Sequence, residues 1–327
     1  MTGMTGQTVL VTGAQGFIGT WLAERLLDDG ARVVVPRRDV EPESRFVIDG
    51  IDQRCVVVAA DVLDYTAVLR VLNEHDVTAV FHLAAQTIVG TANRSPLSTF
   101  DTNIRGTYVL LEACRAVGVL GAPVSGMVVA SSDKAYGSHD ELPYREDFAL
   151  RPRFPYDVSK ACADMLARSY AYTYDLPVAV TRMANVYGGG DVNWSRIVPD
   201  TARALARGDR PVIRSDGTPE RDYLYVTDAV DAYLTVIASL ERPELRGRAW
   251  NAGWGHPVAA RELVDRLIAV SGRDVEPDVQ GTGTPHGEID RQYLDSTAIR
   301  EELGWEPRHD LDHGLRAAWE WYEQRCS

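Results

Sequence analysis

The chain has 327 residues, of which 45% are apolar and 25% charged, a composition typical of a globular protein with a substantial core. Its formal charge of −13 argues against a nucleic-acid partner, which would favour a basic surface. No stretch approaches the roughly 20 continuous apolar residues of a membrane helix, so no membrane partner is expected.

The N-terminus and the cysteines bear on the compartment. The opening segment, Met1 to Gly6, has neither the basic region nor the apolar core of a signal peptide. The cysteines are scattered, with no spacing typical of metal ligands. We therefore expect a cytoplasmic protein with reduced thiols and no metal site.

Short apolar strands alternate with helical segments through the first half of the chain. Strands are predicted at residues 9–11, 33–35, 56–58, 78–83, 127–130 and 178–182. Helices are predicted at residues 21–27, 65–73, 96–117 and 156–174. This alternation is typical of an α/β fold with a doubly wound parallel sheet that helices cover on both faces.

After Tyr187 the pattern changes to shorter elements with more turns. We predict that residues 1–186 form the sheet domain and that later segments, at about 222–252, return to it. Residues 187–327 would mainly form a smaller second lobe.

Gly13, Gly16 and Gly19 follow the first strand and open the first helix. Backbone N–H groups and the helix dipole at such a turn can bind a pyrophosphate, and the missing side chains permit close approach. At the first strand of an alternating pattern, this spacing predicts a dinucleotide site rather than a plain tight turn.

The second strand is followed by Arg37, Arg38 and Asp39, at a place where an acid normally binds the adenosine ribose. Either arginine could instead pair with the 2′-phosphate of NADP. Alternatively, both arginines are solvated and Asp39 contacts the ribose. The pattern favours NADP over NAD, with NAD left open.

Three motifs together resemble the extended short-chain dehydrogenase/reductase family, also described as the NAD-dependent epimerase/dehydratase family. They are Thr12-Gly-Ala-Gln-Gly-Phe-Ile-Gly19, His82-Leu-Ala-Ala-Gln86 and Tyr156-Asp-Val-Ser-Lys160. Later signatures at residues 182–188, 221–223 and 303–307 extend the resemblance over nearly the whole chain. It implies a Rossmann domain, a nucleotide-sugar lobe and commonly a homodimer packed through segments 96–117 and 156–174.

The resemblance also implies which residues bind ligands. Together with the two arginines above, the cofactor residues would be Gly13, Gln15, Gly16, Phe17, Ile18, Gly19, Asp61, Val62, Leu83, Ala84, Ala85, Tyr156 and Lys160. The nucleotide-diphosphate sugar would contact Gln86, Asn185, Arg196, Arg221 and Arg291. Arg221 and Arg291 resemble diphosphate-binding arginines, although surface salt bridges remain an alternative for Arg196 and Arg291. Asn103 resembles a structural asparagine, and His82 is interpreted as a satisfied histidine at a strand end.

The segment Ser131-Ser-Asp-Lys-Ala-Tyr-Gly137 bears on the type of reaction. Family 4-epimerases tend to carry small residues after the catalytic Ser or Thr, whereas 4,6-dehydratases place an acid and a second ionisable group there. Asp133-Lys134 is similar to the CDP-glucose 4,6-dehydratase version. Gly188-Gly-Gly-Asp191 is also similar to that group, which often has lysine where this chain has Ile18.

The catalytic roles follow from these positions. Tyr156 and Lys160 are four residues apart and share a helix face, and a neighbouring ammonium should lower the pKa of the phenol and make it a base. Ser132 would hold the sugar 4-hydroxyl. Asp133 would be the acid and Lys134 the base of an elimination, which requires a protonated carboxyl and a neutral amine in a dry pocket.

The sequence thus predicts a nucleotide-sugar 4,6-dehydratase with a CDP-glucose-like substrate. A nucleotide-sugar 4-epimerase is the alternative, because it needs the same Tyr156, Lys160 and Ser132 but no elimination. A catalytically dead NAD(P)-sensing regulator is disfavoured, because the chain keeps the Tyr/Lys pair.

Overall fold

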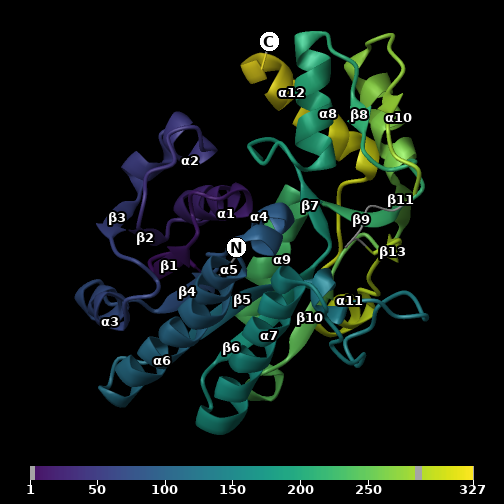
Figure 1. The fold of residues 1–327 in the computed structure, drawn as a ribbon. Helices are drawn as coiled ribbons and strands as arrows, with labels where there is room; N and C mark the ends of the chain where they lie inside the picture. The colour runs from purple at the N-terminus through teal and green to yellow at the C-terminus, as the bar shows by residue number, and fades with distance from the viewer. Residues whose placement is uncertain (1–3, 284–288, 327) are drawn as a thin grey trace.

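The computed structural model describes residues 4–283 and 289–326 and has an α/β architecture (Figure 1). In this part of the chain, a parallel sheet of seven strands has the order β10-β6-β5-β4-β1-β2-β3. The strands are β1 (Thr8–Thr12), β2 (Arg32–Arg37), β3 (Val56–Ala59), β4 (Ala79–His82), β5 (Gly126–Ser132), β6 (Val178–Met183) and β10 (Ala249–Ala252). This sheet confirms the predicted doubly wound α/β fold.

Helices cover both faces of the sheet because successive strand residues point to opposite sides. The helices are α1 (Phe17–Asp28), α3 (Tyr65–Glu74), α6 (Gly106–Val119), α7 (Pro155–Tyr174) and α9 (Val226–Ser239). In β5, Val128 packs with α1 and α9, whereas Met127 and Val129 pack with α3, α6 and α7. Strands buried on both sides explain the continuous apolar runs in the sequence.

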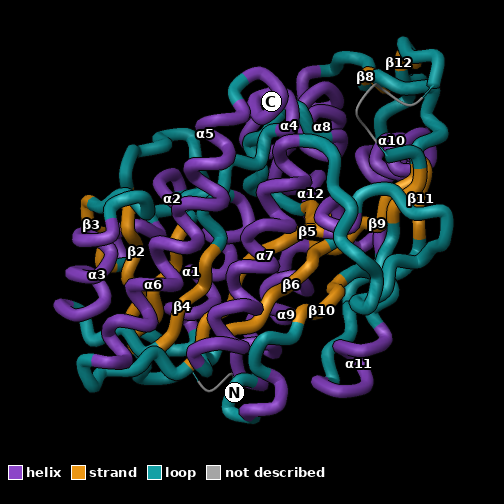
Figure 2. Tube along the Cα trace, turned by 60° about the horizontal axis from the view of Figure 1, so that its bottom comes forward, coloured by secondary structure: helices purple, strands orange, loops and turns teal. Residues whose placement is uncertain are grey.

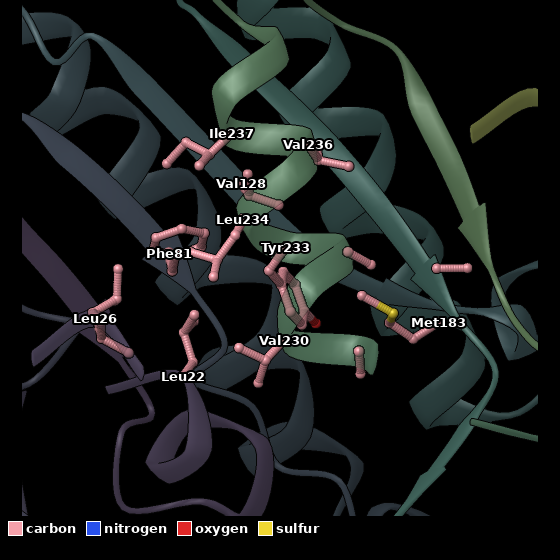
Figure 3. Close-up of a cluster of buried hydrophobic side chains, with 14 of the residues drawn as sticks. Leu22, Leu26, Phe81, Val128, Met183, Val230, Tyr233, Leu234, Val236 and Ile237 are labelled. Atoms are coloured by element: carbon pink, nitrogen blue, oxygen red, sulfur yellow. The ribbon is translucent and has the colours of Figure 1, made fainter. Parts of the chain in front are cut away.

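Figure 3 shows the cluster between α1, α9 and the sheet. Tyr233 of α9 meets Phe81 of β4 edge to face, with ring centroids 6.4 Å apart. Leu22 and Leu26 of α1 are completely buried in the same cluster. Each such side chain contributes roughly 1.5–3 kcal/mol on burial, so this cluster anchors α1 to the sheet.

Shorter elements lie between the main ones. They are α2 (Arg45–Ile48), η1 (Ile51–Arg54), α4 (Val89–Arg94), α5 (Pro96–Phe100), the π-helical η2 (Asp101–Arg105), η3 (Asp133–Tyr136) and η4 (Pro243–Leu245). The helix predicted at 96–117 is therefore α5, η2 and α6 in succession. Within the described residues, none of the helices combines the length and the apolar character that crossing a membrane requires.

A second group of elements lies at one end of the molecule, away from β2 and β3 (Figure 2). Its small sheets comprise β7 (Asn185–Tyr187), β8 (Val212–Ile213), β9 (Glu220–Tyr225), β11 (Pro257–Ala259), β12 (Asp278–Val279) and β13 (Arg291–Gln292). Its helices are α8 (Ile197–Arg207), α10 (Ala260–Ser271) and α12 (Leu311–Cys326), whereas α11 (Thr297–Leu303) packs on β10 and α9. The chain rejoins the large sheet through α9 and β10, while β9 pairs within the small sheet.

A buried ion pair joins β6 to α7. Arg182 is 1% exposed and donates to the Asp164 carboxylate through Nε and Nη2, at 2.8 and 3.1 Å. The Asp164 side chain is 0% exposed. Removing one partner of such a pair leaves an uncompensated charge in the interior.

We expect Asp164→Ala to lower the free energy of unfolding by about 3–5 kcal/mol, because the Arg182 charge would stay buried without its carboxylate. Urea unfolding followed by circular dichroism measures this loss. Glu112→Ala is the control, because it breaks the partly exposed Glu112–Arg115 pair, whose charges water already solvates. Equal losses in the two variants would contradict the importance of the buried pair.

Candidate active site

The carboxyl ends of β1 and β4 lie side by side where the strand order reverses. There, His82 Nδ1 is 2.8 Å from Thr12 Oγ1, and His82 Nε2 is 3.0 Å from Thr107 Oγ1. Burial lowers the pKa of His82 to about 3. The ring is therefore neutral near pH 7 with both nitrogens engaged, which agrees with its interpretation as a satisfied strand-end histidine.

The turn between β1 and α1 requires glycine at two positions. Gly13 has φ +75°, and a Cβ there would lie 2.7 Å from the backbone N of Ala84. A Cβ on Gly19 would collide with the carbonyl oxygen of Gly13. Gly16 caps α1 without a side-chain hydrogen bond, and the first turn of α1 has no acid. The helix N-terminus thus offers backbone N–H groups and a positive dipole end, which fits a pyrophosphate.

The remaining predicted cofactor residues lie in loops at this edge or in the first turn of α1. Asp61 and Val62 follow β3, and Leu83, Ala84 and Ala85 follow β4. Leu83 and Ala84 donate their N–H groups to Thr12, at 3.1 and 3.2 Å. The Phe17 and Ile18 side chains pack against buried clusters.

The end of β2 is rich in internal contacts. Arg37 lies 3.9 Å from Asp52, and Arg38 pairs with Asp39. Gln15 Nε2 donates to the carbonyl oxygen of Asp39 at 2.7 Å. These acids partly neutralise both arginines, so the contacts add no support for a 2′-phosphate site.

Asn103 ties the loop after β4 to α7. Its Oδ1 accepts from Gln86 N at 2.7 Å, and its Nδ2 donates to Gln86 O at 3.0 Å and to Ser159 Oγ at 2.8 Å. Ser159 Oγ in turn donates to Tyr156 O at 2.6 Å. The Gln86 Oε1 atom is buried and has no hydrogen-bond partner within the described residues. The asparagine lies in the π-helical η2, and such turns are frequent at functional sites.

Tyr156 and Lys160 lie on the first turns of α7. Lys160 Nζ donates to the carbonyl oxygen of Ala130 at 2.8 Å, and burial lowers its pKa to about 8. Burial raises the pKa of Tyr156 well above its ordinary value, although the charge of Arg196 acts in the opposite direction. The net pKa of this phenol is therefore raised rather than lowered, because desolvation dominates.

Ser132, Asp133 and Lys134 lie at the junction of β5 and η3. Ser132 Oγ donates to Asp133 Oδ1 at 2.8 Å and accepts from Lys134 N at 3.2 Å. Asp133 is 2% exposed, and its buried Oδ2 has no hydrogen-bond partner in the part of the chain that the structure describes. Burial raises the pKa of this carboxyl, which Lys134 and Ser132 offset only in part. Burial thus shifts the pKa of this carboxyl in the direction that an acid role would need.

Two arginines of the second lobe act on these catalytic candidates. Arg196 donates to Asp191 at 2.9 Å, and its charge lowers the pKa of Tyr156 against the effect of burial. Arg221, on β9, similarly lowers the pKa of Asp133. The structure therefore brings both arginines into electrostatic range of the predicted catalytic groups.

The other predicted substrate residues differ in placement. Asn185, on β7, has a buried Nδ2 without a hydrogen-bond partner among residues 4–283 and 289–326. Arg291, on β13, is exposed and pairs with Glu220 of β9. This exposed pair matches the surface salt-bridge alternative for Arg291, although β13 pairs with β9 and so places Arg291 beside the strand that carries Arg221.

Asp222 is a site residue that the sequence reasoning missed. Its buried carboxylate accepts from the N–H groups of Trp254, Gly255 and Leu294, at 2.9, 3.1 and 3.3 Å. Burial raises its pKa to about 7, and the nearby Asp133 charge adds to this rise. An acid directly before the apolar run 223–226 was the available signal.

Comparison with known proteins places this site in context. Residues 10–318 match the family described as GDP-mannose 4,6 dehydratase. A dTDP-glucose 4,6-dehydratase from Streptomyces griseus is 33% identical, over 98% of this chain and 95% of its own. A UDP-glucose 4-epimerase from Mycolicibacterium smegmatis is 32% identical, over 97% of this chain and 98% of its own. A CDP-glucose 4,6-dehydratase from Salmonella typhimurium is 29% identical, over 97% of this chain and 91% of its own.

Among solved structures, the dTDP-glucose 4,6-dehydratase DesIV from Streptomyces venezuelae, with NAD and TYD bound, superposes with a TM-score of 0.87. It is 28% identical, and the match covers 98% of each chain. The similar proteins thus include both dehydratases and an epimerase of the short-chain dehydrogenase/reductase type. Because the family match extends over most of its length, this chain belongs to the GDP-mannose 4,6-dehydratase family.

Proposed function

We propose that this protein is a nucleotide-sugar 4,6-dehydratase that forms a 4-keto-6-deoxy sugar, with a CDP-glucose-like substrate. The observation that carries the proposal is the placement of Asp133 and Lys134 on η3, directly after Ser132. The glycines of the β1–α1 turn, Gly13, Gly16 and Gly19, would hold NAD(P), which would supply reversible hydride transfer for the sugar carbons C4 and C6.

Tyr156 and Ser132 would act in the oxidation at C4. Ser132 holds the 4-hydroxyl, and Tyr156 accepts its proton. Because burial raises the pKa of Tyr156, the phenolate needs a nearby cation. Arg196 supplies such a charge from the second lobe.

Asp133 and Lys134 would act in the elimination. The ketone at C4 makes the C5 hydrogen acidic, so Lys134 removes it as a proton. Asp133 donates its proton to the C6 hydroxyl, which leaves as water. The raised pKa of Asp133 favours retention of this proton.

The lysine content of the chain supports this assignment. Its sequence contains two lysines, Lys134 and Lys160, and otherwise uses arginine as its basic residue. Arginine stays charged in proteins, whereas lysine can release a proton when buried. The chain thus keeps lysine at the two positions where proton release or a tunable charge matters for the proposed reaction.

A nucleotide-sugar 4-epimerase is the second candidate. The similarity to a UDP-glucose 4-epimerase favours it, and the oxidation at C4 needs the same Tyr156, Lys160 and Ser132. Epimerisation has no use for an acid and a base beside C5 and C6. Asp133 and Lys134 are therefore the residues that favour the dehydratase.

The finer proposals concern the cofactor and the assembly. NADP in preference to NAD rests on Arg37 and Arg38 alone, whereas DesIV was solved with NAD. A homodimer through α5, α6 and α7 is supported by large apolar side chains exposed on these helices, namely Leu97, Tyr108, Met165 and Tyr172. The cytoplasmic location stays a prediction from the sequence.

Incubation with CDP-, UDP-, GDP- and dTDP-hexoses, each with NAD or NADP, tests the proposed reaction by mass spectrometry. We expect loss of one water from a single class, CDP-hexoses first. An isomer of unchanged mass would establish the epimerase instead. Absence of turnover on every sugar would contradict both the dehydratase and the epimerase, and would favour the NAD(P)-sensing regulator instead.

We expect Lys134→Met to slow water loss by roughly 10²–10⁴-fold, the usual contribution of a general base, while the bound cofactor is still reduced. Absorbance of the reduced nicotinamide and product mass measure the two steps separately. Lys134→Arg is the matched control, because it keeps the charge but cannot release a proton. Full water loss in the arginine variant would exclude the base role.

The rate of water loss should fall as pH rises through the raised pKa of Asp133, because the carboxyl then loses the proton that it must donate. Single-turnover rates across a pH series measure this limb. In Asp133→Asn the step should be slow and lack this limb. The same pH dependence in the asparagine variant would assign the limb to another group.

A further inference from the structure

The proposed reaction needs two sets of side chains at a fixed separation. The oxidising pair, Tyr156 and Lys160, lies on α7, whereas the eliminating pair, Asp133 and Lys134, lies on η3. A sugar ring must reach both pairs without moving far. The fold therefore has to contain contacts that fix the position of η3 relative to α7.

Arg182 of β6 contacts both elements through one guanidinium group. Its Nε and Nη2 donate to Asp164, which lies one helical turn beyond Lys160 on α7. Its Nη1 donates to the Tyr136 hydroxyl at 2.8 Å, and Tyr136 is the last residue of η3. The planar fork of arginine fixes the angle between these donors.

Tyr136 is itself held firmly. Its hydroxyl donates to Asn251 Oδ1 at 2.7 Å, and its ring lies 5.0 Å from that of Tyr144 and 4.8 Å from the Arg182 guanidinium carbon. Asn251 Nδ2 donates in turn to the carbonyl oxygen of Tyr144 at 2.9 Å. Arg182, Tyr136 and Asn251 are each at most 1% exposed, so water does not compete for these bonds.

The short turn η3 is thus fastened at both ends. At its start, Ser132 Oγ accepts from Lys134 N. At its end, the Tyr136 hydroxyl joins the network of Arg182. Asp133 lies between these two anchors, on four residues of 3-10 helix, which leaves its carboxyl little freedom.

We propose that Arg182 is a positioning residue that sets the distance between the oxidising and the eliminating pair, an inference that rests on the proposed dehydratase function. It acts through Asp164 on one side and through Tyr136 on the other. Loss of the Tyr136 anchor should misplace Asp133 and Lys134 while leaving Tyr156 and Lys160 on α7 in place.

Tyr136→Phe tests this inference in the full-length protein with the nucleotide sugar that wild type dehydrates. Small misplacements of reacting groups cost up to about a hundredfold, so we expect water loss to slow by roughly 10- to 100-fold. Cofactor reduction at C4 should change far less, so reduced nicotinamide accumulates. Equal slowing of both steps, or of neither, would overturn the inference.

Tyr187→Phe is the matched control. Tyr187 is 4% exposed and its hydroxyl donates to the carbonyl oxygen of Leu311 at 3.2 Å, so this variant also loses one buried hydroxyl. In this variant, the ratio of the rate of water loss to the rate of cofactor reduction should stay at its wild-type value. A shifted ratio in Tyr187→Phe would mean that general loosening, rather than the Tyr136 anchor, controls the ratio.

Arg182→Lys extends the test if Tyr136→Phe does not fold. It keeps the charge beside Asp164 but loses the fork that reaches Tyr136, so it should shift the ratio in the same direction. An unchanged ratio in this variant would overturn the inference. If wild type itself releases no water, the proposed function is contradicted instead. Failure of the positioning inference and failure of the proposed function are therefore distinguishable.

Discussion

Parallel pairing of β1, β4 and β5 is the constraint on which the candidate site depends. Because these strands run in one direction, the residues after each of them emerge at the same edge of the sheet. Gly13 follows β1, Leu83 follows β4 and Asp133 follows β5. The contact of Gly13 with the backbone of Ala84 leaves no room for a side chain. The backbone therefore holds the positive N-terminal end of α1 and the turn η3, which carries Asp133, at one edge of the sheet.

Burial acts on the titratable groups at this edge in one direction, toward their neutral forms. It raises the pKa of Asp133 and Asp222 and lowers that of Lys160. A general acid benefits from this environment, because a raised pKa favours its protonated form. Tyr156 does not benefit, because the same desolvation disfavours the charged phenolate. Asp133, the acid of the elimination, and Tyr156, the base of the oxidation, thus need opposite effects from one pocket. The charge of Arg196 partly offsets the effect of burial on Tyr156.

Features that one short segment determines could be predicted from the sequence. The glycines of the β1–α1 turn follow from spacing and strand order, whereas the Asp133-Lys134 dipeptide was identified through the resemblance to 4,6-dehydratases. Contacts between distant segments could not be predicted. Asp222 accepts from Trp254 and Leu294, which lie 32 and 72 positions along the chain. No local pattern shows that Arg182 reaches Asp164, nor that desolvation dominates the pKa of Tyr156.

The division between elimination and epimerisation has to lie in local chemistry, because a dehydratase and an epimerase both resemble this chain over nearly its whole length. An enzyme that only moves hydride at C4 gains nothing from an acid beside C6. Burying such an acid has a cost, since Asp133 Oδ2 has no hydrogen-bond partner within the described residues. A buried oxygen of this kind is tolerated where a ligand completes its hydrogen bonds. The leaving hydroxyl at C6 would do so. The buried carboxyl of Asp133 is therefore the strongest local argument for the dehydratase.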